Sequence, residues 1–306
     1  MLASGMGEGV FARAGILTDF QGSQQHTSLF FGPRVQENLH LANIHVVGQQ
    51  PAVALELAIT PASIALQGQV QVTVTLQEDG NPEANATVSF QAQALPGSGG
   101  HDHDATRPVG VFSALSCMTG SDGVCSVTYT ASVFGGIETI IASATGTPQQ
   151  SQNLIVSVPG LALLADSTFY TKVGGTVFHL GPPLSPQDHN HYGIAEFNQA
   201  IVSVSSVFKE KFPDRTIFIN DMSLPLGGLF DIGGAWSPPH HYHRLGTSCD
   251  YDLSSGLDSI ANTNEERYLL QAITTVNAAL RLAGRPTLRR LTEGTHWHVY
   301  FPGGGP

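Results

Sequence analysis

Apolar and polar residues alternate with a period of two along much of the first half of the chain. The clearest case is residues 70–76, where valine or leucine at every second position is separated by glutamine or threonine. This alternation predicts strands with one face in a core and the other in water. Similar runs follow between turn-forming segments, at residues 86–90, 125–130, 138–143 and 153–158. About seven strands in roughly a hundred residues predict an all-β, immunoglobulin-like β-sandwich.

The pattern changes to a helical period in the second half. Within residues 193–212 the apolar side chains fall three or four positions apart, at Ile194, Phe197, Ile201, Val204 and Phe208. This spacing predicts an amphipathic helix that Pro213 ends. Residues 265–282 predict a second helix, and residues 216–220 a buried strand. Helices packed on a small antiparallel sheet would give this part an α+β architecture.

These patterns divide the chain into three parts. Residues 1–50 have strand composition in places but no assigned fold, residues 51–159 form the predicted sandwich, and residues 160–306 form the predicted α+β domain. A length of 306 residues is in line with about two domains. Residues 221–236 are a glycine-rich loop that leads into a histidine cluster, and long ordered loops of this kind often line a site.

Histidines and aspartates gather in two clusters that lie about fifty positions apart in the sequence. The clusters hold His240, His241, His243, Asp250 and Asp252 in the first, and Glu293, His296 and His298 in the second. A catalytic zinc ion takes nitrogen and carboxylate ligands of this kind and keeps one position open for water. In a strand, His296 and His298 would share a face, so one could bind a metal while the other touches its water. Gly246 would let the chain turn between His243 and Asp250.

The two clusters resemble those of the zinc peptidases that include lysostaphin-type enzymes, D-Ala-D-Ala carboxypeptidases and the hedgehog signalling domain. The best match is the penicillin-insensitive murein endopeptidase branch, in which a His-x-x-His pair precedes a glycine and an Asp-x-Asp, as it does at residues 240–252 here. The resemblance covers roughly the last half of the chain. It implies Zn²⁺ as cofactor, with His243, Asp250 and His298 as ligands. It also implies that His296 is the general base or an electrostatic stabiliser, and that His240 supports a ligand or contacts substrate.

The sequence departs from that family at one position of the second cluster. Five residues before the last implied ligand, where the murein endopeptidases have histidine, this chain has Glu293. Glu293 is therefore also a catalytic candidate, and a register with His296 as the ligand is an alternative. Cys249, beside Asp250, is either a small buried side chain or a thiol close enough to bind the metal.

The sandwich region resembles bacterial immunoglobulin-like domains of the invasin type. The resemblance rests on residues 59–66 and on residues 122–129 followed by Gly135 and Gly136. It implies a spacer or adhesive module. A loop in this region, residues 99–104, carries His101 and His103 between carboxylates. The favoured interpretation is a solvated loop tip; metal binding and contact with the peptidase cleft are the alternatives.

Composition and cysteine content bear on the possible partners and cellular location of the protein. The formal charge is −11, with 13 Lys and Arg against 24 Asp and Glu, which argues against a nucleic-acid partner. No run is long enough to span a bilayer, and the N-terminus lacks the features of a signal peptide, so the start is truncated or the chain is one piece of a larger product. Cys117 and Cys125 are compatible with a disulfide across a hairpin in an exported protein, or with two free thiols.

The sequence predicts zinc-dependent hydrolysis of a peptide bond by metal-activated water. The resemblance implies a peptide or peptidoglycan substrate in the bacterial cell wall, and an extracellular, periplasmic or cell-surface location. A second hypothesis is a non-catalytic surface adhesion or recognition protein that retains the zinc site, with other domains of a larger surface protein as partners. A third is that the histidine clusters are incidental.

Overall fold

A computed structural model describes residues 15–21, 24–30, 52–174, 190–231, 233–237, 241–253, 263–294 and 296–302. Near the N-terminus, β1 (Gly15–Gln21) and β2 (Gln24–Phe30) form an antiparallel hairpin. The other residues of the segment 1–50 lie outside the described residues, and so do His179, His189 and His240.

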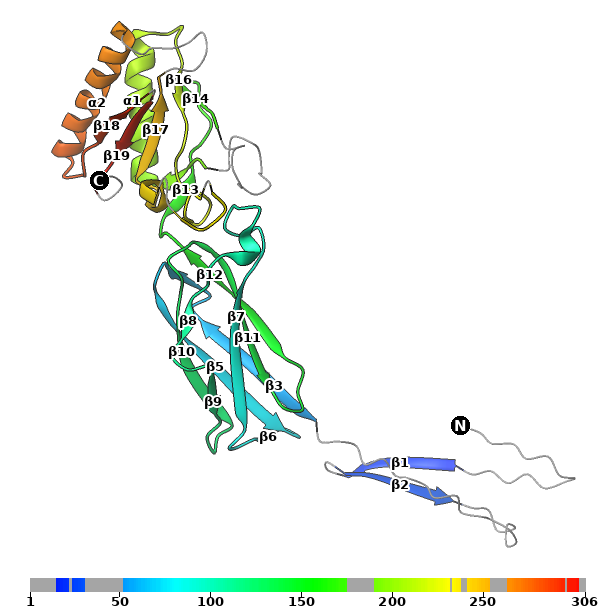
Figure 1. Ribbon diagram of the computed structural model, residues 1–306. Helices are drawn as coiled ribbons and strands as arrows, with labels where there is room; N and C mark the ends of the chain where they lie inside the picture. Colours follow the sequence, from blue (N-terminus) through cyan, green and yellow to red (C-terminus); the bar gives the residue numbers. More distant parts are fainter. Residues whose placement is uncertain are drawn as a thin grey trace, which may run out of the picture.

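The sequence pattern of the sandwich region folds into two facing five-stranded sheets (Figure 1). The first contains β3 (Val53–Thr60), β5 (Gln69–Glu78), β10 (Val124–Thr130) and β8 (Val111–Phe112) in that order, with β6 (Asn81–Pro82) paired to β5. The second has the order β4 (Ser63–Ala65), β12 (Gln150–Ser157), β11 (Gly136–Ala144), β7 (Thr87–Ala94) and β9 (Ser116–Met118). Their inner faces form one core from the alternating apolar positions of β5, β7, β10, β11 and β12. The predicted all-β sandwich is thus present, with more strands than expected.

Cys117 and Cys125 form a disulfide in this sandwich. Cys117 is on β9 and Cys125 on β10, and these strands belong to different sheets. The expectation of a hairpin across this pair is wrong, because the turn between the two strands carries the chain from one sheet to the other. The disulfide therefore links the two layers of the sandwich.

The second half contains a five-stranded sheet with two helices on one face (Figure 1). The strand order is β14 (Tyr170–Lys172), β16 (Ile217–Ile219), β17 (Ser248–Asp252), β19 (His296–Tyr300) and β18 (Arg289–Glu293). The helices are α1 (Ala195–Lys211) and α2 (Asn264–Leu282). Two shorter strands, β13 (Leu161–Leu163) and β15 (Tyr192–Ile194), pair beside this sheet. The α+β arrangement agrees with the prediction.

The sheet is mixed, which corrects the prediction of an antiparallel one. β14 runs parallel to β16, and the other neighbours are antiparallel. A parallel pair needs a long crossover connection, and here the chain passes through α1 between the two strands. The apolar stripe of α1 predicted from its spacing is buried, including Phe197, Ile201, Val204 and Phe208. It packs with Tyr251, Trp297 and α2 residues in one core.

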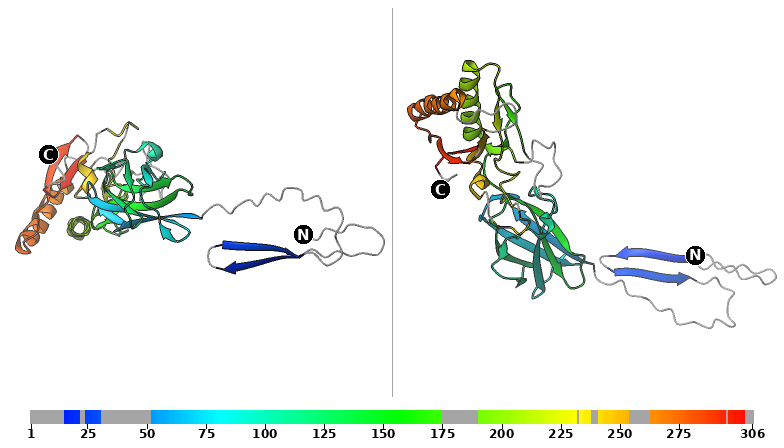
Figure 2. Two further views of the ribbon diagram at one scale, coloured as in Figure 1. Left: turned by 90° about the horizontal axis from the view of Figure 1, so that it is seen from below. Right: turned by 45° about the horizontal axis from the view of Figure 1, so that its top comes forward.

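The sandwich and the α+β part meet end to end, as Figures 1 and 2 show. Backbone hydrogen bonds cross the junction, from the Gly135 amide to the Gly227 carbonyl at 3.0 Å and from the Val158 amide to the Leu226 carbonyl at 2.9 Å. The residues on the α+β side belong to the glycine-rich loop that leads towards the histidine cluster. The junction therefore places one end of the sandwich close to that cluster.

Candidate metal centre

The structure brings His243, Asp250 and His298 together on the sheet face opposite the helices. Asp250 on β17 is paired with His298 on β19, and His243 comes from the short 3-10 helix His241–Leu245 before β17. One ligand atom from each residue lies within 4.8 Å of the others, and each residue is only 2% exposed. Within the described part of the chain, this is the group of three His, Cys, Asp or Glu residues that could hold a metal ion.

Gly246 makes the turn that returns His243 to the strand. Its φ of +65° is in the left-handed region, and its amide donates a hydrogen bond to the His243 carbonyl at 3.0 Å. A Cβ at this position would lie 2.2 Å from the Leu161 Cδ1 atom, so a larger residue would push the turn off β13. The expected role of Gly246 is therefore confirmed.

Ser248 contacts His243 Nδ1, while His243 Nε2 faces Asp250. The Ser248 hydroxyl lies 3.1 Å from the Tyr242 carbonyl and 3.2 Å from His243 Nδ1. When the hydroxyl donates to the carbonyl and accepts from Nδ1–H, the Nε2 atom, 3.6 Å from Asp250 Oδ2, has a lone pair for a cation between the two atoms. When Nε2 carries the proton instead, it donates to Asp250 and the Ser248 hydroxyl donates to Nδ1.

Asp250 is a buried carboxylate with imidazoles on both oxygens. Burial by itself raises the pKa of Asp250, but hydrogen bonds with His243 and His298 outweigh it and hold the pKa well below the usual carboxyl range. His298 Nδ1 lies 2.9 Å from Asp250 Oδ1. Two imidazoles and one carboxylate are ligand types that a catalytic zinc ion takes, so the residues fit zinc in their chemistry.

Two partly exposed residues border one side of the buried group. The His296 side chain is 28% exposed, and its Nε2 atom lies 3.5 Å from Asp250 Oδ2 and 3.3 Å from Glu293 Oε2. Glu293, on β18, is paired in register with His296 and is more exposed still. These two residues thus stand between the buried group and water. His240, the third catalytic candidate, lies outside the described residues.

Two alternatives for the ligand set find no counterpart in this geometry. Cys249 points to the other face of β17, into the core with α1, and burial raises the pKa of its thiol. It therefore cannot close the site as a fourth ligand. Glu293 and His296 contact each other at the rim, but they do not join the buried group of three. The assignment of His243, Asp250 and His298 as metal ligands stays a prediction.

Polar residues around the glycine-rich loop make structural contacts. The Ser223 hydroxyl lies 3.2 Å from the Leu224 carbonyl and 3.1 Å from the Arg244 carbonyl, and the Asp221 carboxylate accepts from the Asn190 side-chain amide at 2.6 Å. His191 is buried with its Nε2 atom 2.9 Å from the Ile219 carbonyl, so it supports the sheet. Trp297 is in the helix-side core.

Two residues near the site were not singled out from the sequence. Ser248 lies two positions before Asp250 on the same strand face, and the alternation of β17 could have indicated it. Phe230 has its ring centroid 6.4 Å from that of His243. Nothing in the local sequence pattern distinguishes Phe230 from the other apolar residues of its loop.

Comparisons with known proteins bear on the sandwich. No protein-family model matches the chain, and no curated protein matches it significantly. Among solved structures, the D00–D0 domains of intimin are 23% identical over 36% of this chain and 50% of theirs, with a TM-score of 0.28. The adhesin InvE of Yersinia pseudotuberculosis is 14% identical over 66% of this chain and 71% of its own, with a TM-score of 0.32. Domains 4 and 5 of the S-layer protein SbsC are 18% identical over 35% of this chain and 53% of theirs, with a TM-score of 0.24.

These neighbours include bacterial adhesin domains, as the resemblance of the sandwich to invasin-type domains implies. The chain spans about half the length of the intimin and SbsC structures. In the part of the chain that the structure describes, neither helix is long and apolar enough to serve as a membrane span.

Proposed function

We propose that the chain binds Zn²⁺ at His243, Asp250 and His298 and uses it to hydrolyse a peptide bond. The observation that carries the proposal is the convergence of three buried potential ligands from two separate sequence clusters. Burying two imidazoles around a carboxylate without a cation would be costly, and a bound metal ion removes that cost. A partly exposed histidine beside the group leaves room for a substrate to approach.

Each residue has a defined part in this proposal. A zinc ion held here would lower the pKa of a bound water towards about 7 and polarise the scissile carbonyl. Ser248 keeps the proton on His243 Nδ1 and leaves Nε2 for the metal. His296 Nε2 contacts two carboxylates, so His296 can hold a proton there and pass it to a leaving group. Glu293 orients the His296 ring from the rim.

The substrate class follows from the sequence resemblance to cell-wall peptidases. A bacterial cell-wall peptide is the proposed substrate, and the disulfide between the two sheets supports an oxidising, extracytoplasmic location. The net charge of −11 gives no electrostatic attraction to anionic polymers. Recognition would therefore depend on short-range contacts at the site.

The test measures bound metal and peptidoglycan digestion on the purified full chain. We expect about one zinc ion per chain in the parent protein, and loss of both zinc and digestion in His243→Ala. His26→Ala, in the N-terminal hairpin, is the matched control and should keep both. Loss of zinc from His243→Ala with undiminished digestion would refute the mechanism.

A second candidate is a non-catalytic surface recognition protein that keeps the zinc site. The two-layer sandwich with its disulfide favours it, since such modules are common in cell-surface proteins. The same assay separates the candidates. A parent protein that binds zinc and sediments with peptidoglycan, but releases no peptide from it, would support recognition and contradict catalysis.

A further inference from the structure

A loop of the sandwich, residues 99–107, contacts the segment around Phe230 that packs against His243. We name residues 99–107 the sandwich loop; the glycine-rich loop is residues 221–236. The two loops are in contact at the junction of the two halves. The solvated-tip interpretation of the sandwich loop is therefore wrong, because His101 is buried and His103 is largely covered. Among the described residues the two histidines belong to no group that could hold a metal.

His101 holds the backbone of the glycine-rich loop. Its Nε2 atom lies 2.7 Å from the Leu229 carbonyl, which can only accept, so Nε2 carries the proton and donates. Burial is the largest effect on His101, and it lowers the pKa and keeps the ring neutral. The ring also packs edge-on against Trp236, with centroids 4.7 Å apart. His101 is thus a fixed donor to one peptide group across the junction.

His103 holds the same loop two residues further along. Its Nε2 atom lies 3.2 Å from Asp231 Oδ2, and the Asp231 carboxylate is fully buried. The same Asp231 oxygen accepts a hydrogen bond from the Trp236 backbone amide. The His103 ring packs on Trp236 with centroids 4.6 Å apart. Asp231 is therefore tied both to the sandwich and to its own loop.

Phe230 stands between these two held residues. It is buried, and its ring packs beside that of the candidate ligand His243. The loop also contains Gly227, Gly228, Gly233 and Gly234. Glycine loses more conformational freedom on ordering than any other residue, so this loop needs outside contacts to hold one conformation. The contacts at Leu229 and Asp231 supply them on either side of Phe230.

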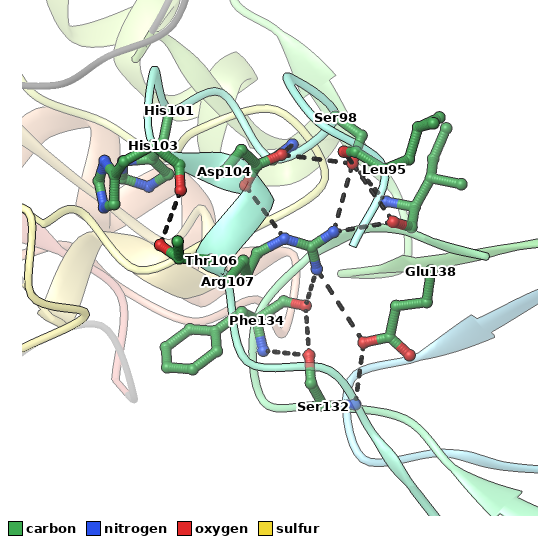
Figure 3. Close-up of polar contacts among 12 residues, drawn as sticks. Leu95, Ser98, His101, His103, Asp104, Thr106, Arg107, Ser132, Phe134 and Glu138 are labelled. Carbon is green, nitrogen blue, oxygen red and sulfur yellow. Dashed lines mark hydrogen bonds and ion pairs between the residues drawn. The ribbon is translucent and has the colours of Figure 1, made fainter. Parts of the chain in front are cut away.

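Buried polar contacts hold the sandwich loop, and Figure 3 draws them around Arg107. The buried Arg107 guanidinium contacts Asp104 at 3.1 Å, Glu138 at 4.0 Å and the Ile137 carbonyl at 2.9 Å. Asp104 also accepts from the Gly99 amide at 2.7 Å. Breaking one partner of a buried charge network is costly, so the loop presents its histidines from a fixed base.

We propose that His101 and His103 are positioning residues for the metal centre. By holding Leu229 and Asp231, they fix Phe230 against His243 and so fix the orientation of that ring. The inference rests on the proposed zinc site, and it assigns to the sandwich a direct part in shaping that site. Groups that orient a metal ligand change metal affinity by roughly 10–100-fold, and an effect passed through a packed ring should be near tenfold.

The experiment compares His101→Leu with His101→Gln in the full chain. Leucine removes the donor to Leu229, whereas a glutamine amide can reach the same carbonyl. We expect His101→Leu to bind zinc about tenfold more weakly in a chelator competition, and to shift the visible spectrum of Co²⁺ loaded in its place. Hydrogen exchange in residues 227–236 should speed up in His101→Leu, and His101→Gln should restore all three readouts. His103→Leu should act in the same direction.

Ser126→Ala is the control. It removes a hydroxyl contact with Thr73, at 3.1 Å, between β10 and β5, and it touches neither the sandwich loop nor the glycine-rich loop. It should leave zinc affinity and the Co²⁺ spectrum unchanged. Parent-like zinc affinity in both His101→Leu and His103→Leu would overturn the positioning role and leave the zinc site standing. A parent protein that binds no zinc would overturn the proposed function and this inference together.

Discussion

Ser248 is a small residue with a large expected influence, because in the proposed zinc site it accepts from His243 Nδ1 and leaves Nε2 for the metal. The Ser248 hydroxyl is buried and lies within hydrogen-bond distance of the Tyr242 carbonyl and of His243 Nδ1. Without it, either nitrogen could carry the proton, and the ring could rotate. The same logic places a partner behind most metal-binding histidines in proteins.

Ser248→Ala should therefore weaken zinc binding about 10–100-fold while the fold is retained. The measurement is zinc affinity by competition with a chromophoric chelator, with circular dichroism to check folding. Ser203→Ala, at a half-buried serine of α1 whose hydroxyl donates to the Gln199 carbonyl, is the control that should bind zinc like the parent. Equal affinities of Ser248→Ala and Ser203→Ala would mean that the tautomer of His243 is set by another group.

At the scale of the element, the two faces of β17 have different roles: one carries a candidate metal ligand and the other packs in the core. Ser248 and Asp250 face the site, while Cys249 and Tyr251 between and beyond them enter the helix-side core. A one-residue change of register would exchange the two sets. The fixed pairing of Asp250 with His298 on β19 is therefore what keeps the candidate ligands together.

Cys249→Ser tests this separation. A hydroxyl placed in an apolar core without a partner costs about 1–3 kcal/mol, so the free energy of unfolding should fall by that amount. Because Cys249 points away from the site, zinc content should stay at the parent level. Unfolding in urea and metal analysis on the same samples give both quantities. A loss of zinc with little loss of stability would instead place the thiol on the metal.

The elements show which parts of the fold and the site the sequence could predict. Long periodic segments were found correctly, such as the strand around residues 70–76 and the helix within residues 193–212, because their buried faces repeat many times. Edge strands such as β6 and β8 have only two residues each, too short to show any period. The parallel partner of β16 was missed because β14 is also short and lies about forty residues earlier.

The candidate site was predictable for a different reason. Its residues combine rare side chains with fixed spacing, and strand geometry alone puts His296 and His298 on one face. The packing of Phe230 and the role of His101 were not predictable, because they depend on which loops meet at the junction. Contacts between loops of two separate domains do not produce a repeating pattern of apolar residues in the sequence.

At the scale of the whole molecule, the junction depends on how closely two backbones approach. A Cβ on Gly135 would lie 2.2 Å from the Leu226 carbonyl oxygen, at a position where the glycine backbone needs no positive φ. The close approach allows the Gly135 amide to bond the Gly227 carbonyl at 3.0 Å. The absence of a side chain at Gly135 is thus what lets the sandwich and the glycine-rich loop stay in contact.

Gly135→Ala should therefore push the two halves apart at this point, at a cost of about 1–3 kcal/mol for the overpacked methyl group. We expect faster hydrogen exchange and faster proteolysis in residues 224–237, with the sandwich strands still protected. Gly146→Ala is the control, since Gly146 has a φ of +83° and its Cβ would meet nothing within 4 Å. That variant should strain only its own turn, because Gly146 lies between β11 and β12 and makes no junction contact. If Gly135→Ala leaves residues 224–237 as protected as Gly146→Ala does, the junction is not held by this approach of the two backbones.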